Sequence, residues 1–167
     1  TDLPGAYGTA YKFTVRAHDD SAYGTGLTGY FTLDNRGMPV VSNVTASQRT
    51  DGSKIVDIYY DVSDSDTPNL SISLSIQGAS PSAPVSLSGD IGASVPRGTG
   101  RHIVWNCGTD WPGQYGSSFR AVVTASDGSS SASGYSGYFA IDKRSAPVVT
   151  NVTATQRTDG SRIVDVY

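Results

Sequence analysis

The chain has 167 residues, a net charge of −3 and a single cysteine, Cys107. The slight negative charge excludes the basic surface of a nucleic-acid-binding protein and the polybasic patch of a membrane-surface protein. No apolar run is long enough to insert into a bilayer as a helix. A disulfide within the chain is excluded, so packing has to stabilise the fold. We expect Cys107 to be a small buried side chain, with a link between two subunits as the alternative.

A repeat of 108 residues organises the sequence. Residues 39–59 return almost unchanged as residues 147–167, and the same offset holds elsewhere without a gap. We therefore expect residues 1–38 to be the C-terminal part of one module, 39–146 a complete module, and 147–167 the first strands of the next. We interpret the chain as a window of a longer repetitive protein. The alternative is that strands of neighbouring molecules complete both ends.

The complete module reads as a succession of short strands separated by turns. The predicted strands cover residues 40–48, 54–60, 70–77, 85–87, 102–106, 118–126 and 135–142. Asp51-Gly52 supplies the tight turn between the first two, and residues 70–77 alternate aliphatic and polar side chains with a period of two. Residues 61–69 and 89–100 are predicted loops, and 107–117 a corner. No segment has helical periodicity, so the pattern predicts an all-β fold of tandem β-sandwich modules.

The two copies of the sixth strand predict which side chains face the core. Positions that stay apolar should point inward, while the positions between them are mostly polar and vary freely. The inward pairs are Tyr11/Phe119, Phe13/Ala121, Val15/Val123 and Ala17/Ala125. On the last strand, Tyr135, Phe139 and Ile141 are expected on one face.

The segment Tyr11-Lys-Phe-Thr-Val-Arg-Ala-His-Asp19 resembles the penultimate strand of fibronectin type III and related immunoglobulin-like modules, with Tyr7 and Tyr115 as candidates for their tyrosine corner. The wider pattern includes His-Ile-Val-Trp-Asn at 102–106 and Asp-Trp-Pro-Gly-Gln-Tyr at 110–115. It is similar to sandwich modules of exported bacterial proteins, some of which precede formylglycine-generating-enzyme-like domains. The resemblance implies a fold and an extracellular or cell-surface location. It brings no catalytic residue of that enzyme family onto this chain.

Few residues suggest chemistry. Asp61, Asp64 and Asp66 share one loop, and closely spaced carboxylates can bind Ca²⁺. A solvated turn is the expected reading, because the loop lacks the glycine and further oxygen ligands of a calcium loop. His18 and His102 have no companion at metal-ligand spacing. We therefore expect no cofactor, no resident metal and no enzyme activity.

Candidate contact residues come from the last strand and from the junctions. Tyr30 and Tyr138 occupy the same position in the two copies, each after a glycine, and should point away from the core. They can form a flat aromatic contact surface, or each can pack on a cross-strand neighbour.

The repeated pairs Asp34/Arg36 and Asp142/Arg144 precede each module boundary. They are expected to pair across that boundary and to stiffen the array, although exposed ion pairs contribute little singly.

Short junctions between near-identical modules favour a semi-rigid array, since no Gly/Ser-rich spacer separates them. The leading hypothesis is a non-enzymatic extracellular structural protein whose stacked modules form a fibre, filament or stalk through self-association. The alternative is an adhesin repeat or a carbohydrate-binding accessory module with a surface glycan or protein ligand. Exposed aromatic residues beside a groove would favour the alternative.

Overall fold

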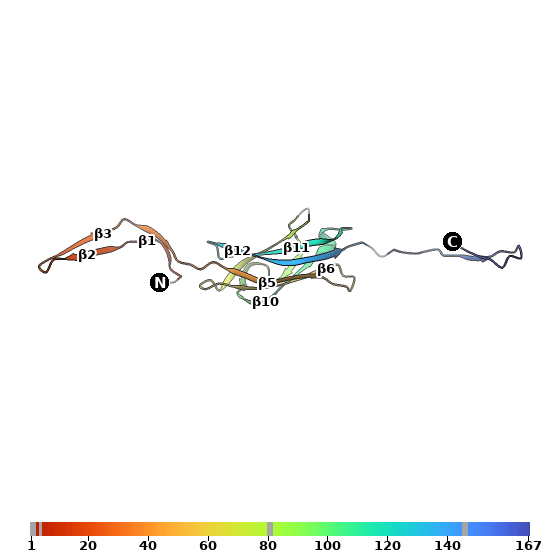
Figure 1. Ribbon diagram of the computed structural model, residues 1–167, viewed down its shortest axis with the longest axis horizontal. Coiled ribbons are helices and arrows are strands. Elements are labelled where there is room, and N and C mark those ends of the chain that lie inside the picture. The colour runs from red at the N-terminus through yellow and green to blue at the C-terminus, as the bar shows by residue number, and fades with distance from the viewer. Residues whose placement is uncertain (1–2, 4, 80–81, 145–146) are drawn as a thin grey trace.

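The chain is all-β, with antiparallel strand pairing throughout the described residues. The structure is a computed structural model and describes residues 3, 5–79, 82–144 and 147–167 (Figure 1). The first part contains β1 (Tyr7–Tyr11), β2 (Thr14–His18), β3 (Tyr23–Leu27) and β4 (Phe31–Asp34). The central part contains β5 (Val40–Gln48), β6 (Ile55–Ser63), β7 (Asn69–Gln77), β8 (Leu87–Gly89), β9 (Gly92–Pro96), β10 (Gly98–Asn106), α1 (Cys107–Asp110), β11 (Tyr115–Ser126) and β12 (Ser131–Asp142). The last part contains β13 (Ala154–Gln156) and β14 (Val164–Val166).

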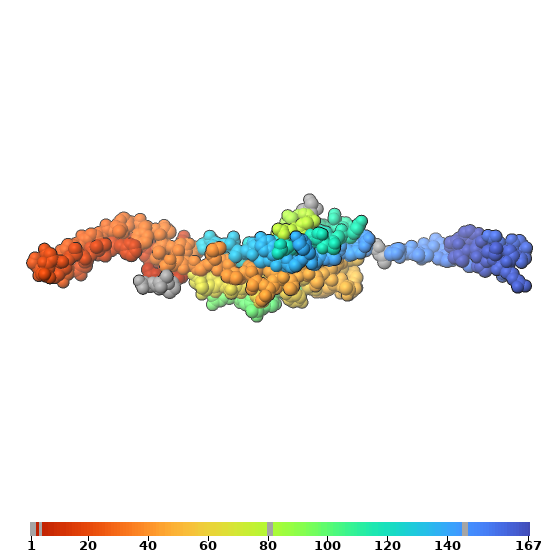
Figure 2. Space-filling model, in the orientation of Figure 1, coloured from red at the N-terminus to blue at the C-terminus, as the bar shows by residue number. Residues whose placement is uncertain are grey.

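The three parts follow one another along the long axis of the molecule. β1 to β4 form a long, bent hairpin at one end, and β13 and β14 form a short hairpin at the other (Figure 1). The space-filling view shows that only the central part is thick, while both ends are one hairpin wide (Figure 2). The core of the described structure therefore lies within residues 39–143.

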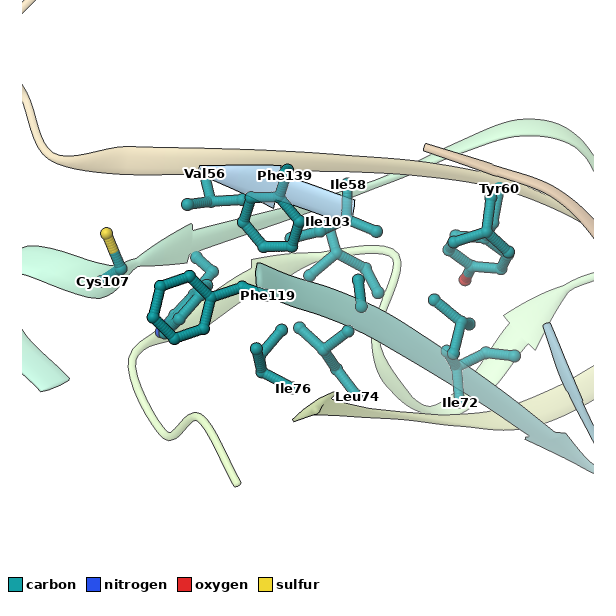
Figure 3. Close-up of a cluster of buried hydrophobic side chains, with 14 of the residues drawn as sticks. Val56, Ile58, Tyr60, Ile72, Leu74, Ile76, Ile103, Cys107, Phe119 and Phe139 are labelled. Carbon is teal, nitrogen blue, oxygen red and sulfur yellow. The ribbon is translucent and has the colours of Figure 1, made fainter. Parts of the chain in front are cut away.

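Two four-stranded sheets enclose this core, in an arrangement compatible with a β-sandwich. One sheet has the strand order β5-β6-β10-β8 and the other β12-β11-β7-β9. Figure 3 shows Val56, Ile58 and Ile103 of the first sheet facing side chains of the second. The buried cluster comprises Val44, Val56, Ile58, Tyr60, Val62, Leu70, Ile72, Leu74, Ile76, Val95, Ile103, Trp105, Cys107, Trp111, Phe119, Ala121, Val123, Ala125, Phe139 and Ile141.

Alternation places one side of β7 and one side of β11 in this cluster. On β7, the four aliphatic side chains that alternate with polar ones are all buried, as their period of two predicts. On β11, the predicted inward residues Phe119, Ala121, Val123 and Ala125 are buried as well. Cys107 is fully buried and its Sγ donates to the Lys54 carbonyl at 3.0 Å. The burial expected for this cysteine is confirmed.

The expected inward position of Tyr135 is wrong. The pairing of β11 with β12 shifts between Arg120 and Val122, so β12 carries an irregularity near residue 137. This changes the phase of the alternation: Ser136 is buried and Tyr135 is 48% exposed. The Ser136 hydroxyl oxygen accepts from the Ala121 N–H and also donates to the Gly137 carbonyl. It thereby satisfies backbone groups that regular pairing would have used.

Several predicted boundaries also differ from the structure. The predicted loop at 89–100 contains β9 and the start of β10, because glycines there adopt positive φ and bend the chain without ending the pairing. The predicted corner at 107–117 opens with the one-turn helix α1, whose Asn106 side chain accepts from the Thr109 N–H. Its Trp111 packs edge-on against Trp105, with ring centroids 4.5 Å apart.

The terminal hairpins have the same strand pairing as the corresponding central strands. Tyr7 pairs with Asp34 as Tyr115 pairs with Asp142, and β2–β3 repeat the second half of β11–β12 residue for residue. The pairing of β13 with β14 likewise repeats that of β5 with β6. Even the unusual backbone conformations recur.

The recurring residues with positive φ are Asn43/Asn151, Gly52/Gly160, Lys54/Arg162, Gly5/Gly113 and Asp20/Gly128.

The burial of the terminal hairpins differs from that of the central strands. Phe13 and Val15 are each 64% exposed, although Ala121 and Val123 at the corresponding places are fully buried. The expected inward orientation at these positions therefore does not lead to burial. Among the described residues, no second sheet covers this side of β1–β4.

Candidate functional site

The outer face of β11–β12 carries an exposed aromatic and cationic cluster. Arg120 of β11 lies directly opposite Tyr138 of β12. Its guanidinium carbon is 4.8 Å from the ring centroid of Tyr135 and 5.8 Å from that of Tyr138. The Arg120 Nε also donates to the Ser136 carbonyl at 2.7 Å, which fixes the guanidinium between the two rings. Such cation–π contacts contribute about 0.5–1 kcal/mol each at an exposed site.

The N-terminal hairpin repeats part of this cluster. Tyr30 takes the place of Tyr138, and Lys12 that of Arg120, with the Lys12 ammonium 4.0 Å from the ring centroid. Tyr30 is 70% and Tyr138 73% exposed. A Cβ added to Gly29 or Gly137 would meet no atom within 4 Å. Each tyrosine therefore both packs on a cross-strand cation and leaves most of its ring beside open space.

This arrangement can bind a flat partner. An exposed tyrosine ring next to a cation and a bare glycine can stack on another aromatic ring or on the apolar face of a sugar. The phenol and the cation can then hydrogen-bond to groups at its edge. The same combination occurs once in each copy, so a partner with a matching period would meet it twice.

The junction pairs form ion pairs, but within each tripeptide rather than across the boundary. The Arg36 guanidinium donates to both oxygens of Asp34, at 3.0 Å each, and Arg144 binds Asp142 in the same way at 3.0 and 2.8 Å. The expected pairing across the boundary is thus replaced by a local one, because residues two apart in an extended chain point to the same side. The Arg144 hydrogen bonds hold the pKa of the Asp142 carboxyl well below its usual range.

Each junction arginine also covers a tyrosine. Arg144 lies 4.4 Å from the Tyr115 ring centroid, and Arg36 lies 4.1 Å from that of Tyr7. Tyr115 is 63% exposed and Tyr7 56%. These tyrosines are therefore exposed residues that lie against an arginine of the same junction.

The contact that does join the first junction to the central part comes from the acidic loop. Asp66 Oδ2 accepts from the Gly37 N–H at 3.1 Å, and Pro39 is fully buried. Asp64 is buried too, and its Oδ1 accepts from two backbone N–H groups of its own loop at 3.0 and 2.9 Å. Burial raises the pKa of Asp64, but these hydrogen bonds outweigh it and the net shift is downward.

Each carboxylate of the acidic loop accepts hydrogen bonds from groups outside the cluster or from its own loop. Asp61 accepts from the Asn43 side chain and the Gly100 N–H, both at 2.7 Å. Within the described ranges, no three acidic, histidine or cysteine side chains converge as metal ligands would.

The outer face of the other sheet carries a cluster that sequence reasoning missed. Arg49 donates to both oxygens of Asp57, at 2.7 and 2.8 Å, and His102 Nε2 lies 2.8 Å from Asp57 Oδ1. The His102 ring stacks on Tyr59, its cross-strand partner, with centroids 4.3 Å apart. The Arg49 hydrogen bonds, together with His102, lower the pKa of Asp57 to about 2. The same ion pair recurs as Arg157 and Asp165. Repetition of these two residues in the sequence is the signal from which the pair could have been predicted.

Lys143 is a second residue that the sequence did not single out. It is 6% exposed, and its ammonium lies 4.8 Å from the Trp111 ring centroid and 5.6 Å from that of Trp105. Burial lowers its pKa. Asp110 accepts from the Trp105 indole N–H at 2.8 Å on the same end of the sandwich. The corresponding residue in the first copy is Asn35, so this arrangement is not repeated.

No protein-family model, curated protein or solved structure matches the chain. Among the residues that the structure describes, no helix combines the length and apolar character needed to cross a membrane. The relation to immunoglobulin-like and fibronectin type III-like modules therefore stays an expectation from the residues quoted above.

Proposed function

We propose that this chain is a non-enzymatic structural repeat protein, exported by a bacterium, whose tandem immunoglobulin-like modules of about 108 residues stack into a fibre, filament or stalk. One observation carries the proposal: strand register, turn conformation and ion pairs recur at the same offset in the terminal hairpins and the central part. Repetition of structure at a fixed spacing is what a linear array requires.

The connection between modules supports the same reading. β4 ends at Asp34 and β5 begins at Val40, and the Gly37–Asp66 hydrogen bond ties the residues between them to the central part. The Asp34/Arg36 ion pair and the buried Pro39 restrict the same segment further. A short, restrained junction favours a fixed rotation and rise from one module to the next.

Electron microscopy of the purified protein, paired with sedimentation velocity over a range of concentrations, tests this proposal. We expect slender particles that lengthen or bundle as concentration rises. Single globular particles with one sedimentation coefficient at every concentration would contradict it.

The runner-up function is adhesion or carbohydrate binding, and the exposed ring of Tyr138 favours it. Here the matched variants are Tyr30→Ser with Tyr138→Ser, against Tyr23→Ser as the control. Tyr23 is a similarly exposed tyrosine, at 65%, but Ser131 stands at its place in the second copy. Its replacement therefore leaves the repeated tyrosines, Tyr30 and Tyr138, unchanged. Titration with a panel of oligosaccharides should show saturable binding that only the double variant loses. If no protein binds a glycan and only the double variant loses bundling, the two tyrosines belong to contacts between molecules instead.

A further inference from the structure

Arg120 has no carboxylate partner among the described residues. Arg49, Arg101 and Arg144 each form an ion pair with an aspartate, at 2.7, 3.7 and 2.8 Å. The Arg120 guanidinium instead donates to the Ser136 carbonyl, through its Nε. Its terminal nitrogens carry further N–H donors, for which the described residues supply no acceptor. The cation on the outer face of β11 is therefore available to an anion from outside.

Two tyrosines flank this guanidinium and keep their own rings accessible. Tyr135 is 48% and Tyr138 73% exposed, and the Arg120 guanidinium lies against both rings. The Ser136 hydrogen bond holds it there before any ligand arrives. A side chain already held in its binding orientation loses less conformational entropy on association. A ligand at this face therefore meets a positioned cation and an open aromatic ring together.

The remainder of this outer face carries uncharged side chains in rows across β7, β11 and β12. The rows are Gln77, Arg120 and Tyr138; Ser75, Val122 and Tyr135; Ser73, Thr124 and Ser133; and Ser71, Ser126 and Ser131. Serine and threonine hydroxyls both donate and accept hydrogen bonds, as sugar hydroxyls do. The outer face of β6, by contrast, carries Asp57 and Asp61. The β7–β11–β12 face is therefore complementary to an anionic ligand that is rich in hydroxyls.

These features together select one class of ligand. Arginine binds a carboxylate through a pair of parallel N–H···O bonds, and an exposed tyrosine ring stacks on the apolar face of a sugar. We propose that the outer face of β7–β11–β12 binds a glycan containing uronic acid, with the sugar carboxylate on the terminal nitrogens of Arg120 and the sugar ring on Tyr138. The inference goes beyond the fibre. It rests on the runner-up function and names the charged group that the glycan carries.

The first copy shows that the module fold does not require this combination. Lys12 stands at the place of Arg120, and Leu27 at that of Tyr135. A lysine ammonium is a point charge without the planar fork of arginine, and leucine offers no aromatic face. The residue types of the first copy therefore supply conservative substitutions for the central part: Arg120→Lys keeps the charge and removes the fork, and Tyr135→Leu keeps an apolar side chain and removes the ring.

Calorimetric titration of the whole chain tests the proposal. The probes are oligogalacturonate, the same oligosaccharide with methyl-esterified carboxyls, a sulfated glycan of similar length, and poly-glutamate. The ester keeps the sugar rings and hydroxyls and loses the charge. We expect saturable binding of oligogalacturonate, and binding of the ester that is weaker by about tenfold or more, because hydrogen bonds to a charged group are lost.

The variants separate the carboxylate contact from ring stacking. Arg120→Gln should weaken oligogalacturonate binding by about tenfold and leave the ester unaffected, and Arg120→Lys should recover part of the loss. Tyr138→Ser and Tyr135→Leu should weaken both sugars by the same factor. The matched control is Arg49→Gln, which should change neither, because that guanidinium already binds both oxygens of Asp57. Circular dichroism of each variant checks that the strands are retained.

Equal affinity for oligogalacturonate and its ester would overturn the assignment of the carboxylate and leave binding of a neutral glycan standing. Tighter binding of the sulfated glycan would overturn it in favour of sulfate, and equal binding of poly-glutamate would assign the face to acidic peptides. Equal losses in Arg49→Gln and Arg120→Gln would overturn the assignment of the face. Absence of binding to every glycan would reject the runner-up function as well, while the fibre is decided separately by microscopy.

Discussion

The hairpin from Tyr7 to Asp34 and the strands from Tyr115 to Asp142 share their register, their irregularity and their turn, yet they differ in burial. Asp19 and Asp127 each accept backbone N–H groups from the residues that follow them in the turn. The difference shows that local turn chemistry and cross-strand pairing set the register, while burial depends on the sheet that packs opposite.

Truncation of matched inward aromatics should give the largest contrast. Phe119→Ala opens a cavity in the core and should lower the free energy of unfolding by about 3–5 kcal/mol. Tyr11→Ala, at the corresponding place, should change it by less than about 0.5 kcal/mol at low protein concentration. Urea denaturation followed by Trp fluorescence measures the cost in the central part, since Trp105 and Trp111 lie in its core, and far-UV circular dichroism follows the strands of both parts. Equal costs would show that the two hairpins are equally packed.

Removal of the glutamine that closes the sandwich should have the next largest effect. Gln48→Ala leaves both backbone groups of Asp142 without this partner and should cost about 1–2 kcal/mol, from two hydrogen bonds. Gln156→Ala should leave the same unfolding midpoint unchanged when the protein is dilute. If Gln156→Ala lowers the free energy of unfolding only at high protein concentration, Gln156 takes part in a contact between molecules.

Acid should destabilise the central part through Asp57 by about 1 kcal/mol. The folded-state pKa of Asp57, about 2, lies below its ordinary value of 3.8. The ion pair therefore contributes stability above pH 4 that is lost as the pH falls through 2. Unfolding measured between pH 6 and 2 should be less pH-dependent in Asp57→Asn, whereas Asp165→Asn should match the unchanged protein. The magnitude is small because Arg49 is partly exposed to solvent.

The junction ion pairs should give the smallest effect. Arg144→Ala and Arg36→Ala each remove an exposed pair and should shift stability by about 0.5 kcal/mol or less. Their expected influence is on the junction instead. Small-angle scattering should detect a change in the maximum dimension of Arg36→Ala, because the junction becomes less restrained. An unchanged scattering profile would show that Arg36 does not restrain the junction.

Much of the fold was predictable because its signals are local. The aliphatic alternation at 70–77 and the Asp51-Gly52 turn each depend on neighbouring residues only, and the structure has both where the pattern placed them. The prediction for Tyr135 is wrong because a one-residue irregularity in β12 reverses the alternation of inward and outward side chains. The residue types at 131–138 do not predict this irregularity. β9 was missed because glycines that allow positive φ look the same in a loop and in a bent strand.

The candidate sites were less predictable, because they depend on cross-strand neighbours. Tyr138 was placed on the outer face from its repetition, but the position of Arg120 between two rings follows from the pairing of β11 with β12. Lys143 could not be found by comparing the copies, since Asn35 stands at the corresponding place. The His102–Asp57 contact joins residues 45 apart in the chain, and only the sheet order brings them together.

The chain enters the central part through β5 and leaves it through β12, at opposite ends of the long axis (Figure 1). Tension applied to the segments on either side of the central part would therefore pull β5 and β12 in opposite directions along their length. The hydrogen bonds between β5 and β6 would bear that load side by side and would have to break together, whereas peeling from one end would break them singly. A unit loaded in this direction is suited to carrying mechanical force along its length.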